Sequence, residues 1–307
     1  MNAFDECATG QDSDSFAECI RDAMLYWARP AAYDCVAALC GSAFAVPARA
    51  DGACVGCPLE QAADARLDFL GHALGFRWER LCPVLPPGSP ERDATRRHLQ
   101  RSLADGALLI HGPIPRWRLS AGLGSGMAHF EAEDVAAPPS CRRPPRQRTY
   151  LLHPGEPCLT RCEATRETLR SGAAMATGSW PWPGALYGPA MYDAWIAELD
   201  GGDSCLTVNP EGQRCALRAA RRIRRSSQSA AHYLERAADS LPGLLAVDRV
   251  DPIVAAYRDV AVAFDDVAAV HGEDAPGWTR VSLRCVRSAR TRHGEAARRL
   301  SHLASLL

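Results

Sequence analysis

The chain has 307 residues, 47% of them hydrophobic, so it can bury a substantial core as one large domain or two smaller ones. Its 35 basic and 36 acidic residues leave a net charge of −1, which argues against nucleic acid or an anionic membrane as a partner. Every basic residue is arginine, and the absence of lysine excludes Schiff-base and catalytic-lysine mechanisms.

Targeting signals are not evident in the sequence. No run approaches the roughly 18 apolar residues that a membrane helix needs. The N-terminus, MNAFDECATGQDSDSF, lacks the charged-then-apolar pattern of a secretory signal. We therefore expect a cytoplasmic protein whose 13 cysteines are mostly buried thiols and not a disulfide scaffold.

The first half of the chain mixes helix and strand signals. Apolar residues at helical spacing predict helices after Phe16, in YDCVAALCGSAF, at 60–76 and at 91–104. Short apolar runs bounded by Gly and Pro predict strands at 77–85 and 106–112. Two further candidate strands cover 127–135 and 148–153, on either side of a Pro- and Arg-rich loop. We interpret residues 1–157 as a mixed α/β unit.

The second half is helical almost throughout. A helix is expected to begin near Thr160, and the Gly-, Pro- and Trp-rich stretch 171–189 is predicted to be a linker. Apolar residues at helical spacing then predict helices at 190–199, 213–239, 251–270 and 279–306. We interpret 158–307 as a helical region, whose apolar faces pack on the first unit or against a second copy in a homodimer.

Cys19 is the first candidate for a reactive residue. The cluster Asp12-Ser13-Asp14-Ser15 offers helix N-caps just ahead of it, which would place Cys19 in the first turn of a buried helix. Unpaired N–H groups and the helix dipole favour the thiolate there, and the thiolate is the nucleophilic form. The alternative is a small apolar core residue, which is the usual role of a cysteine outside a disulfide.

A thiol nucleophile needs a histidine within hydrogen-bond reach, oriented by a further polar group. Three of the nine histidines lie on candidate strands, namely His111, His129 and His153. His232, His293 and His302 lie on the predicted C-terminal helices and are expected at the surface. The sequence leaves open which of the three would act as the base.

Other motifs carry less specific signals. Cys54 and Cys57, with Cys158 and Cys162, would provide four thiolates for a metal, so a cysteine-rich metal protein is one hypothesis. These spacings are poorer than two paired CxxC knuckles, and we expect no metal site. The arginine run 220–227 fits a solvated helix face, and GLGSG at 122–126 lacks the GK[ST] ending of a phosphate loop.

The order of several motifs resembles that of the papain-like (peptidase C39-like) proteins grouped with the N-terminal domain of the butirosin-type acyltransferase. The motifs that carry the resemblance are Cys19 with its helix, YDCVAALCGSAF, Cys57-Pro58 and a helix ending in GHALGF. GPAMYDAWIAEL, near the start of the helical half, is similar to the "GLxAYDAWIxxL" of these relatives. The similarity covers roughly residues 16 to 307.

The resemblance implies an α+β fold, with a papain-like core followed by a helical C-terminal region. It implies cysteine-dependent acyl transfer or amide formation in specialised metabolism, without a cofactor. The partners would be an acyl carrier protein or small-molecule acyl donor and an amine acceptor. The aromatic residues Trp180, Trp182 and Tyr187 would line a substrate cleft, although packing explains them equally well.

Roles carry over by position. Cys19 matches the nucleophile, and AHFEAED matches the histidine strand at His129 and Asp134. His153 stands where relatives carry an aspartate, and it or Asp134 would orient His129. A competing alignment puts Trp117 or Arg118 at the histidine position. The alternative function is therefore a non-catalytic binding or scaffold protein of the same fold.

Overall fold

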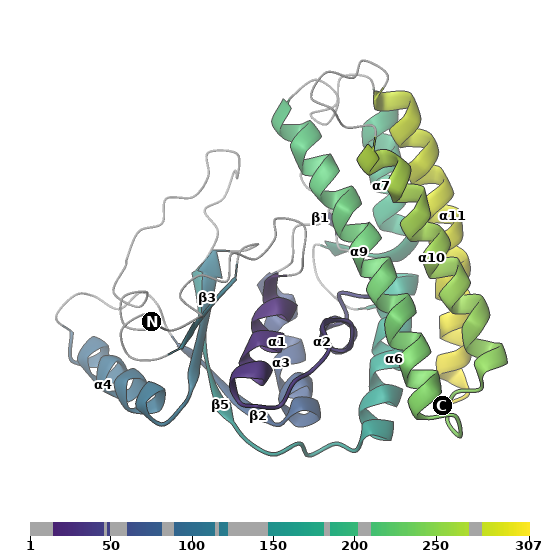
Figure 1. Cartoon of the computed structure of the whole chain (residues 1–307). Coiled ribbons are helices and arrows are strands. Elements are labelled where there is room, and N and C mark those ends of the chain that lie inside the picture. The colour runs from purple at the N-terminus through teal and green to yellow at the C-terminus, as the bar shows by residue number, and fades with distance from the viewer. Residues whose placement is uncertain are drawn as a thin grey trace. The chain divides into compact units, whose positions relative to one another are not determined.

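A computed structural model describes residues 15–45, 48–49, 60–81, 89–113, 117–121, 147–180, 185–201, 210–269 and 278–307 (Figure 1). The chain is a mixed helix-and-sheet protein of the α+β type. Its contacts divide it into two compact units. Among described residues, the first unit holds 15–32 and the segment from Glu60 to Thr160, and the second holds 33–49 and 161–307.

The first unit is built on an antiparallel sheet. Its described strands are β2 (Phe76–Leu81), β3 (Leu108–Pro113), β4 (Arg118–Ala121) and β5 (Gln147–Pro154), in the order β2-β5-β3-β4. Its helices are α1 (Ser15–Tyr26), α3 (Glu60–Leu74) and α4 (Pro90–Ala104). The strand predicted at 148–153 is confirmed as β5. The one predicted at 127–135 lies outside the described residues.

Strand register assigns each side chain to one face of this sheet. On β5, Tyr150 contacts the rings of Trp78 and Trp117, and Trp117 in turn contacts Phe16 of α1. The next residue, Leu151, belongs instead to an apolar cluster with Leu99 and other residues of α4. The sheet therefore has an α1 face and an α4 face, and Figure 1 shows the two helices on its opposite sides.

Local signals explain the helix ends. Ser89 caps α4 by accepting a hydrogen bond from the Arg92 amide at 3.2 Å, and Pro90 occupies the first turn, where no N–H is needed. At the far end of α1, Arg29 donates to the carbonyls of Gly75 and Gly155 and pairs with Glu156 at 2.8 Å. These contacts hold the end of α1 to the turns that flank β2 and β5.

The second unit is helical. It contains α2 (Tyr33–Cys40), α6 (Arg161–Thr177), α7 (Gly188–Asp200), α9 (Pro210–Ser240), α10 (Val247–Ala269) and α11 (Trp278–Ser305). A two-residue ladder, β1 (Ala48–Arg49) with β6 (Ala185–Leu186), also belongs to it. The predicted linker is wrong for residues 171–177, which form the last turns of α6.

Buried aromatic rings form much of the core of the helical unit. Trp195 of α7 stacks on Phe264 of α10 with ring centroids 5.8 Å apart. Phe44, which follows α2, packs edge-on against Tyr233 of α9 and Tyr257 of α10. Through these rings the segment after α2 is part of the same core as helices from the end of the chain.

Candidate functional site

Cys19 lies on α1, the helix that packs against β4. Cys19 is only 3% exposed. Residues three apart on a helix are neighbours on its surface, so Cys19 follows Phe16 along one face of α1. Phe16 contacts Trp117, just before β4, with ring centroids 5.2 Å apart. The thiol is therefore carried on the part of α1 that faces this edge of the sheet.

The position of Cys19 within α1 differs from the one expected. The helix begins at Ser15, so Cys19 is its fifth residue and lies just beyond the first turn. In helix geometry the amide of the fifth residue pairs with the carbonyl of the first. The Cys19 N–H is thus directed at the Ser15 carbonyl, and an oxyanion would need donors from elsewhere.

His153 lies on β5 and points to the α4 face. It is two residues beyond Leu151 on the same strand, and alternate residues share a face. Its Nε2 is 3.3 Å from Oε1 of Glu79 on the neighbouring strand β2. The structure therefore does not bring His153 together with Cys19, whose helix covers the other face.

His111 also points to the α4 face. It is two residues beyond Leu109, which packs with α4, and its Nε2 is 3.2 Å from Oγ of Ser120 on β4. Both candidate histidines on described strands therefore lie on the face opposite α1. His129 and Asp134 fall between β4 and β5 in sequence, outside the described residues, and their pairing with Cys19 stays a prediction.

The aromatic residues predicted to line a substrate cleft belong to the helical unit. Tyr187 is buried in a small apolar cluster with Ala45 and Met175, against which Trp180 packs. Burial raises the pKa of the Tyr187 phenol above its ordinary value. Trp182 lies outside the described residues. Packing within the helical unit therefore explains the positions of Tyr187 and Trp180 without a substrate cleft.

A cluster of ionisable side chains on the α4 face was missed in the sequence. Glu79 Oε1 accepts contacts from two ring nitrogens, Nε2 of His98 on α4 at 2.5 Å and Nε2 of His153 on β5 at 3.3 Å. All three side chains are partly exposed. The contacts join residues from three separate elements, so no local spacing could have indicated the cluster. The carboxylate that the two imidazoles share ties α4 to the sheet.

Acidic side chains next to Cys19 were also missed. Glu18 and Asp22 are both buried, although α1 is otherwise apolar on its packed side. Asp22 Oδ1 accepts a hydrogen bond from the guanidinium of Arg21 at 2.6 Å. The available signal was two acids four residues apart, which share a helix face, within an apolar run. Asp22 is three residues after Cys19 and so neighbours it on the helix surface.

Metal binding finds no support in the described part of the chain, where no group of three Cys, His, Asp or Glu side chains is placed to hold an ion. Cys54 and Cys57, one half of the hypothetical four-thiolate site, lie outside it. Cys158 is exposed, and its Sγ is 3.6 Å from the Glu156 carbonyl.

None of the described helices has the length and apolar character needed to cross a membrane. No family model matches the chain, and no curated protein matches it either.

Proposed function

We propose that the protein is a cysteine-dependent acyltransferase or amide synthase, with Cys19 as nucleophile and His129 as its base. The observation that carries this proposal is the packing of α1 against the β4 edge of an antiparallel sheet. The chain that leaves β4 leads to His129 and Asp134 before it returns as β5. The papain-like resemblance of the sequence around Cys19 supports the same assignment.

In the proposed reaction His129 first accepts the Cys19 proton. The thiolate attacks the carbonyl carbon of an acyl thioester, an acyl–enzyme bond forms, and the donor thiol leaves with the proton from His129. An amine then attacks the acyl–enzyme and gives a proton to His129. The amide is released, and the same proton returns to the Cys19 sulfur. Asp134 orients the imidazole, and His153 has no part, because it contacts Glu79 on the α4 face.

A carrier protein or small-molecule thioester is the proposed acyl donor, and an amine is the acceptor. These assignments rest on the resemblance and extend the proposal for Cys19.

A second candidate is a non-catalytic binding or scaffold protein of the same fold. Two observations favour it. Cys19 is almost fully buried, and the described histidines His111 and His153 both point away from α1. In this case Cys19 is a core residue and carries no special reactivity.

Alkylation of the full chain by iodoacetamide at neutral pH, with modified peptides quantified by mass spectrometry, separates the two candidates. Catalytic function predicts that Cys19 reacts faster than the exposed Cys158, because an activated thiolate outweighs its limited access. His129→Gln should slow alkylation of Cys19 by about tenfold or more, because without an imidazole partner only a few per cent of an ordinary thiol is thiolate at neutral pH. His153→Gln is the matched control and should leave the rate unchanged.

If Cys19 reacts no faster than Cys158, the nucleophile assignment fails and the second candidate stands. Equal effects of His129→Gln and His153→Gln would remove His129 as the base while leaving a reactive Cys19. An acylated Cys19 peptide after incubation with a simple acyl thioester would add direct evidence for transfer.

A further inference from the structure

The α4 face of the sheet carries a serine and a histidine that the proposed reaction does not use. His111 of β3 and Ser120 of β4 both lie on this face, because Leu109, directly opposite Ser120 in the strand register, packs with α4. Nε2 of His111 is 3.2 Å from Oγ of Ser120. A hydroxyl within hydrogen-bond reach of an imidazole is the arrangement of a nucleophile and its base.

The Ser120 hydroxyl has a partner that can take up a proton. The hydroxyl of Thr168 in α6, by contrast, donates to the carbonyl of Ala164, one turn back in its own helix. A backbone carbonyl does not act as a base, whereas a neutral imidazole nitrogen does. In the tautomer that leaves Nε2 unprotonated, His111 accepts the hydrogen bond from Ser120 and is placed to remove its proton.

The neighbouring strands bring two further polar groups next to His111. The register sets Thr149 of β5 and Arg118 of β4 directly opposite His111, one on each side of it. Side chains opposite each other on one face have Cβ atoms about 4.5–5.5 Å apart. A hydroxyl at Thr149 is suited to hold the other ring nitrogen and so to fix the tautomer. Arg118 is exposed, and its guanidinium supplies positive charge beside the pair.

Ser120 lies at the margin of the apolar cluster under α4. Its cross-strand neighbour Leu109 is fully buried and packs with Leu99. In the described sheet β4 is an edge strand, so the pair is near an edge and not in the middle. Ser120 is only 4% exposed, whereas His111 is partly exposed, so a substrate has to reach Oγ from the side of His111. These neighbours favour a short apolar acyl group over a long or charged one.

We propose that Ser120 and His111 form a second nucleophile–base pair, which hydrolyses esters of short acyl groups. Oγ of Ser120 bonds to the ester carbonyl carbon while Nε2 of His111 takes the hydroxyl proton, and Arg118 stabilises the charge on the carbonyl oxygen. The bond from this carbon to the alcohol oxygen breaks, and the alcohol leaves with the proton from His111. Water then attacks the acyl–serine and gives a proton to His111. The carboxylic acid is released as that proton returns to Oγ.

A fluorophosphonate, which reacts with activated serine hydroxyls, tests the proposal on the full chain. Oγ displaces fluoride from phosphorus, and peptide mass spectrometry locates the adduct. We expect an adduct at Ser120 in the unsubstituted chain and none there in Ser120→Ala. His111→Gln should slow its formation by about a hundredfold or more, as expected for the loss of a general base. An unsubstituted chain without an adduct at Ser120 would overturn the proposal.

Two control variants separate this pair from other groups. His153→Gln removes an imidazole from the same face of the sheet, where its partner is Glu79, and should leave the rate of adduct formation unchanged. Equal slowing by His111→Gln and His153→Gln would remove His111 as the base, and this comparison does not require that Ser120→Ala folds. Cys19→Ala should also leave the rate unchanged, because α1 covers the opposite face.

Turnover of p-nitrophenyl acetate by the Cys19→Ala chain completes the test. We expect repeated hydrolysis by this variant, and the further change Ser120→Ala should remove most of it. A rate that survives the loss of both residues would show that Ser120 does not hydrolyse esters. Failure of the Cys19 assignment leaves this result untouched, since the pair acts without the thiol.

Discussion

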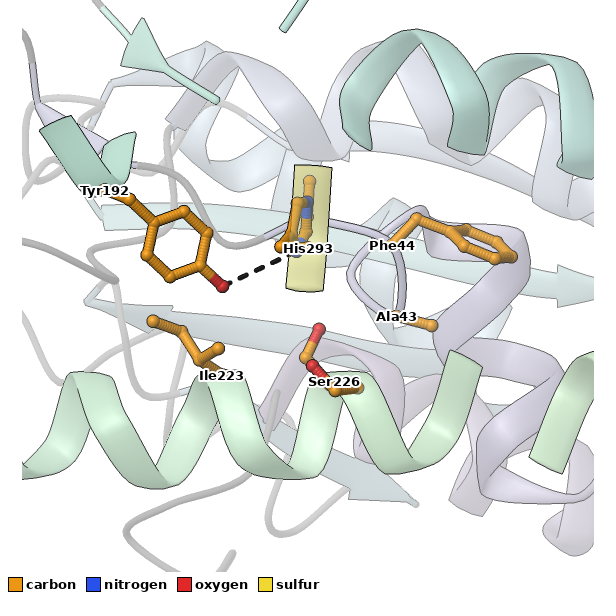
Figure 2. Close-up of a pocket in the computed structure, with 8 residues that line it drawn as sticks. Ala43, Phe44, Tyr192, Ile223, Ser226 and His293 are labelled. Atoms are coloured by element: carbon orange, nitrogen blue, oxygen red, sulfur yellow. Dashed lines mark hydrogen bonds between the residues drawn. The ribbon is translucent and has the colours of Figure 1, made fainter. Parts of the chain in front are cut away.

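His293 is buried in the helical unit (Figure 2), so the expectation that it lies at the surface is wrong. The rings of Tyr192 and Tyr257 pack against it, with centroids at 5.3 and 6.0 Å, and both phenols are buried. Burial lowers the pKa of His293 to about 4, and the nearby Ala176 carbonyl opposes only part of this shift. The folded protein therefore holds His293 neutral at pH values where an exposed histidine is charged.

This shift predicts a loss of stability in acid. The unfolded chain binds a proton at His293 near pH 6.5, whereas the folded chain binds it only near pH 4, so stability falls as pH drops between these values. The full effect is about 3 kcal/mol in the free energy of unfolding. Denaturant unfolding at about pH 7 and about pH 4.5 should reveal most of it.

Substitution of His293 tests whether this residue causes the pH dependence of the unfolding free energy. His293→Gln should flatten the change in unfolding free energy between the two pH values, even if the variant is less stable at both. His302→Gln is the matched control, since His302 is an exposed residue of the same helix. An equal slope in His293→Gln and the unsubstituted chain would show that the folded and unfolded chains bind a proton at His293 equally well, so that burial does not lower its pKa.

Helix α6 contains a glycine at a close approach. A Cβ at Gly172 would lie 2.4 Å from Cδ2 of Phe44, closer than real contacts allow. The Phe44 ring cannot easily yield, because Tyr233 and Tyr257 pack edge-on against it. Gly172 is therefore required by packing, although glycine is a poor helix former.

Glycine-to-alanine changes in two helices should consequently have opposite signs. Gly172→Ala should destabilise the protein by about 1–3 kcal/mol, because it overpacks a filled core. Gly294→Ala in α11 meets nothing closer than 3.8 Å and should stabilise by about 0.5–1 kcal/mol. Thermal or denaturant unfolding measures both. Stabilisation by Gly172→Ala would mean that Phe44 can shift at little cost.

The strands show which elements a sequence can reveal. The residues TYLL within the run RTYLLH are apolar, β-branched or aromatic, and the predicted strand at 148–153 differs from β5 by one residue at each end. Strand β4 was missed, since RLSA is only four residues long and lies between Pro- and Gly-rich stretches. The prediction of a linker at 171–177, where α6 in fact continues, was also misled by local composition. Gly172 and small residues appear as a linker until the long-range contact with Phe44 is known.

The candidate site was less predictable than the elements. Helical spacing around Cys19 correctly indicated a buried helix. His153 contacts Glu79, which also contacts His98, and both of these residues are distant from it in sequence and give no local pattern. Alternation along a strand identifies two faces, but only tertiary packing decides which one meets α1.

The two units should respond separately to core mutations. Phe44 is fully buried in the helical unit, and Leu109 is fully buried in the sheet unit. Phe44→Ala should cost about 3–5 kcal/mol and raise hydrogen exchange in α6, α9 and α10. Leu109→Ala should cost about 2–5 kcal/mol and raise exchange mainly in the sheet and α4. Hydrogen exchange of the full chain, read by peptide, measures both.

Two results would contradict the prediction that the units respond separately to Phe44→Ala and Leu109→Ala. If Phe44→Ala loosens the sheet as strongly as the helices, the two units unfold as one cooperative body. If it leaves α9 and α10 unchanged, the segment after α2 is not part of their core.

The place of Phe44 in the helical core also constrains the order in which the chain can fold during synthesis. Phe44 leaves the ribosome early, whereas its partners Tyr233 and Tyr257 are made only after the whole sheet unit. Contacts between such distant residues form slowly, because a long loop must close first. The sheet unit can therefore assemble before Tyr233 and Tyr257 are available to pack against Phe44. The exposed ring is then a site at which a chaperone would bind the nascent chain.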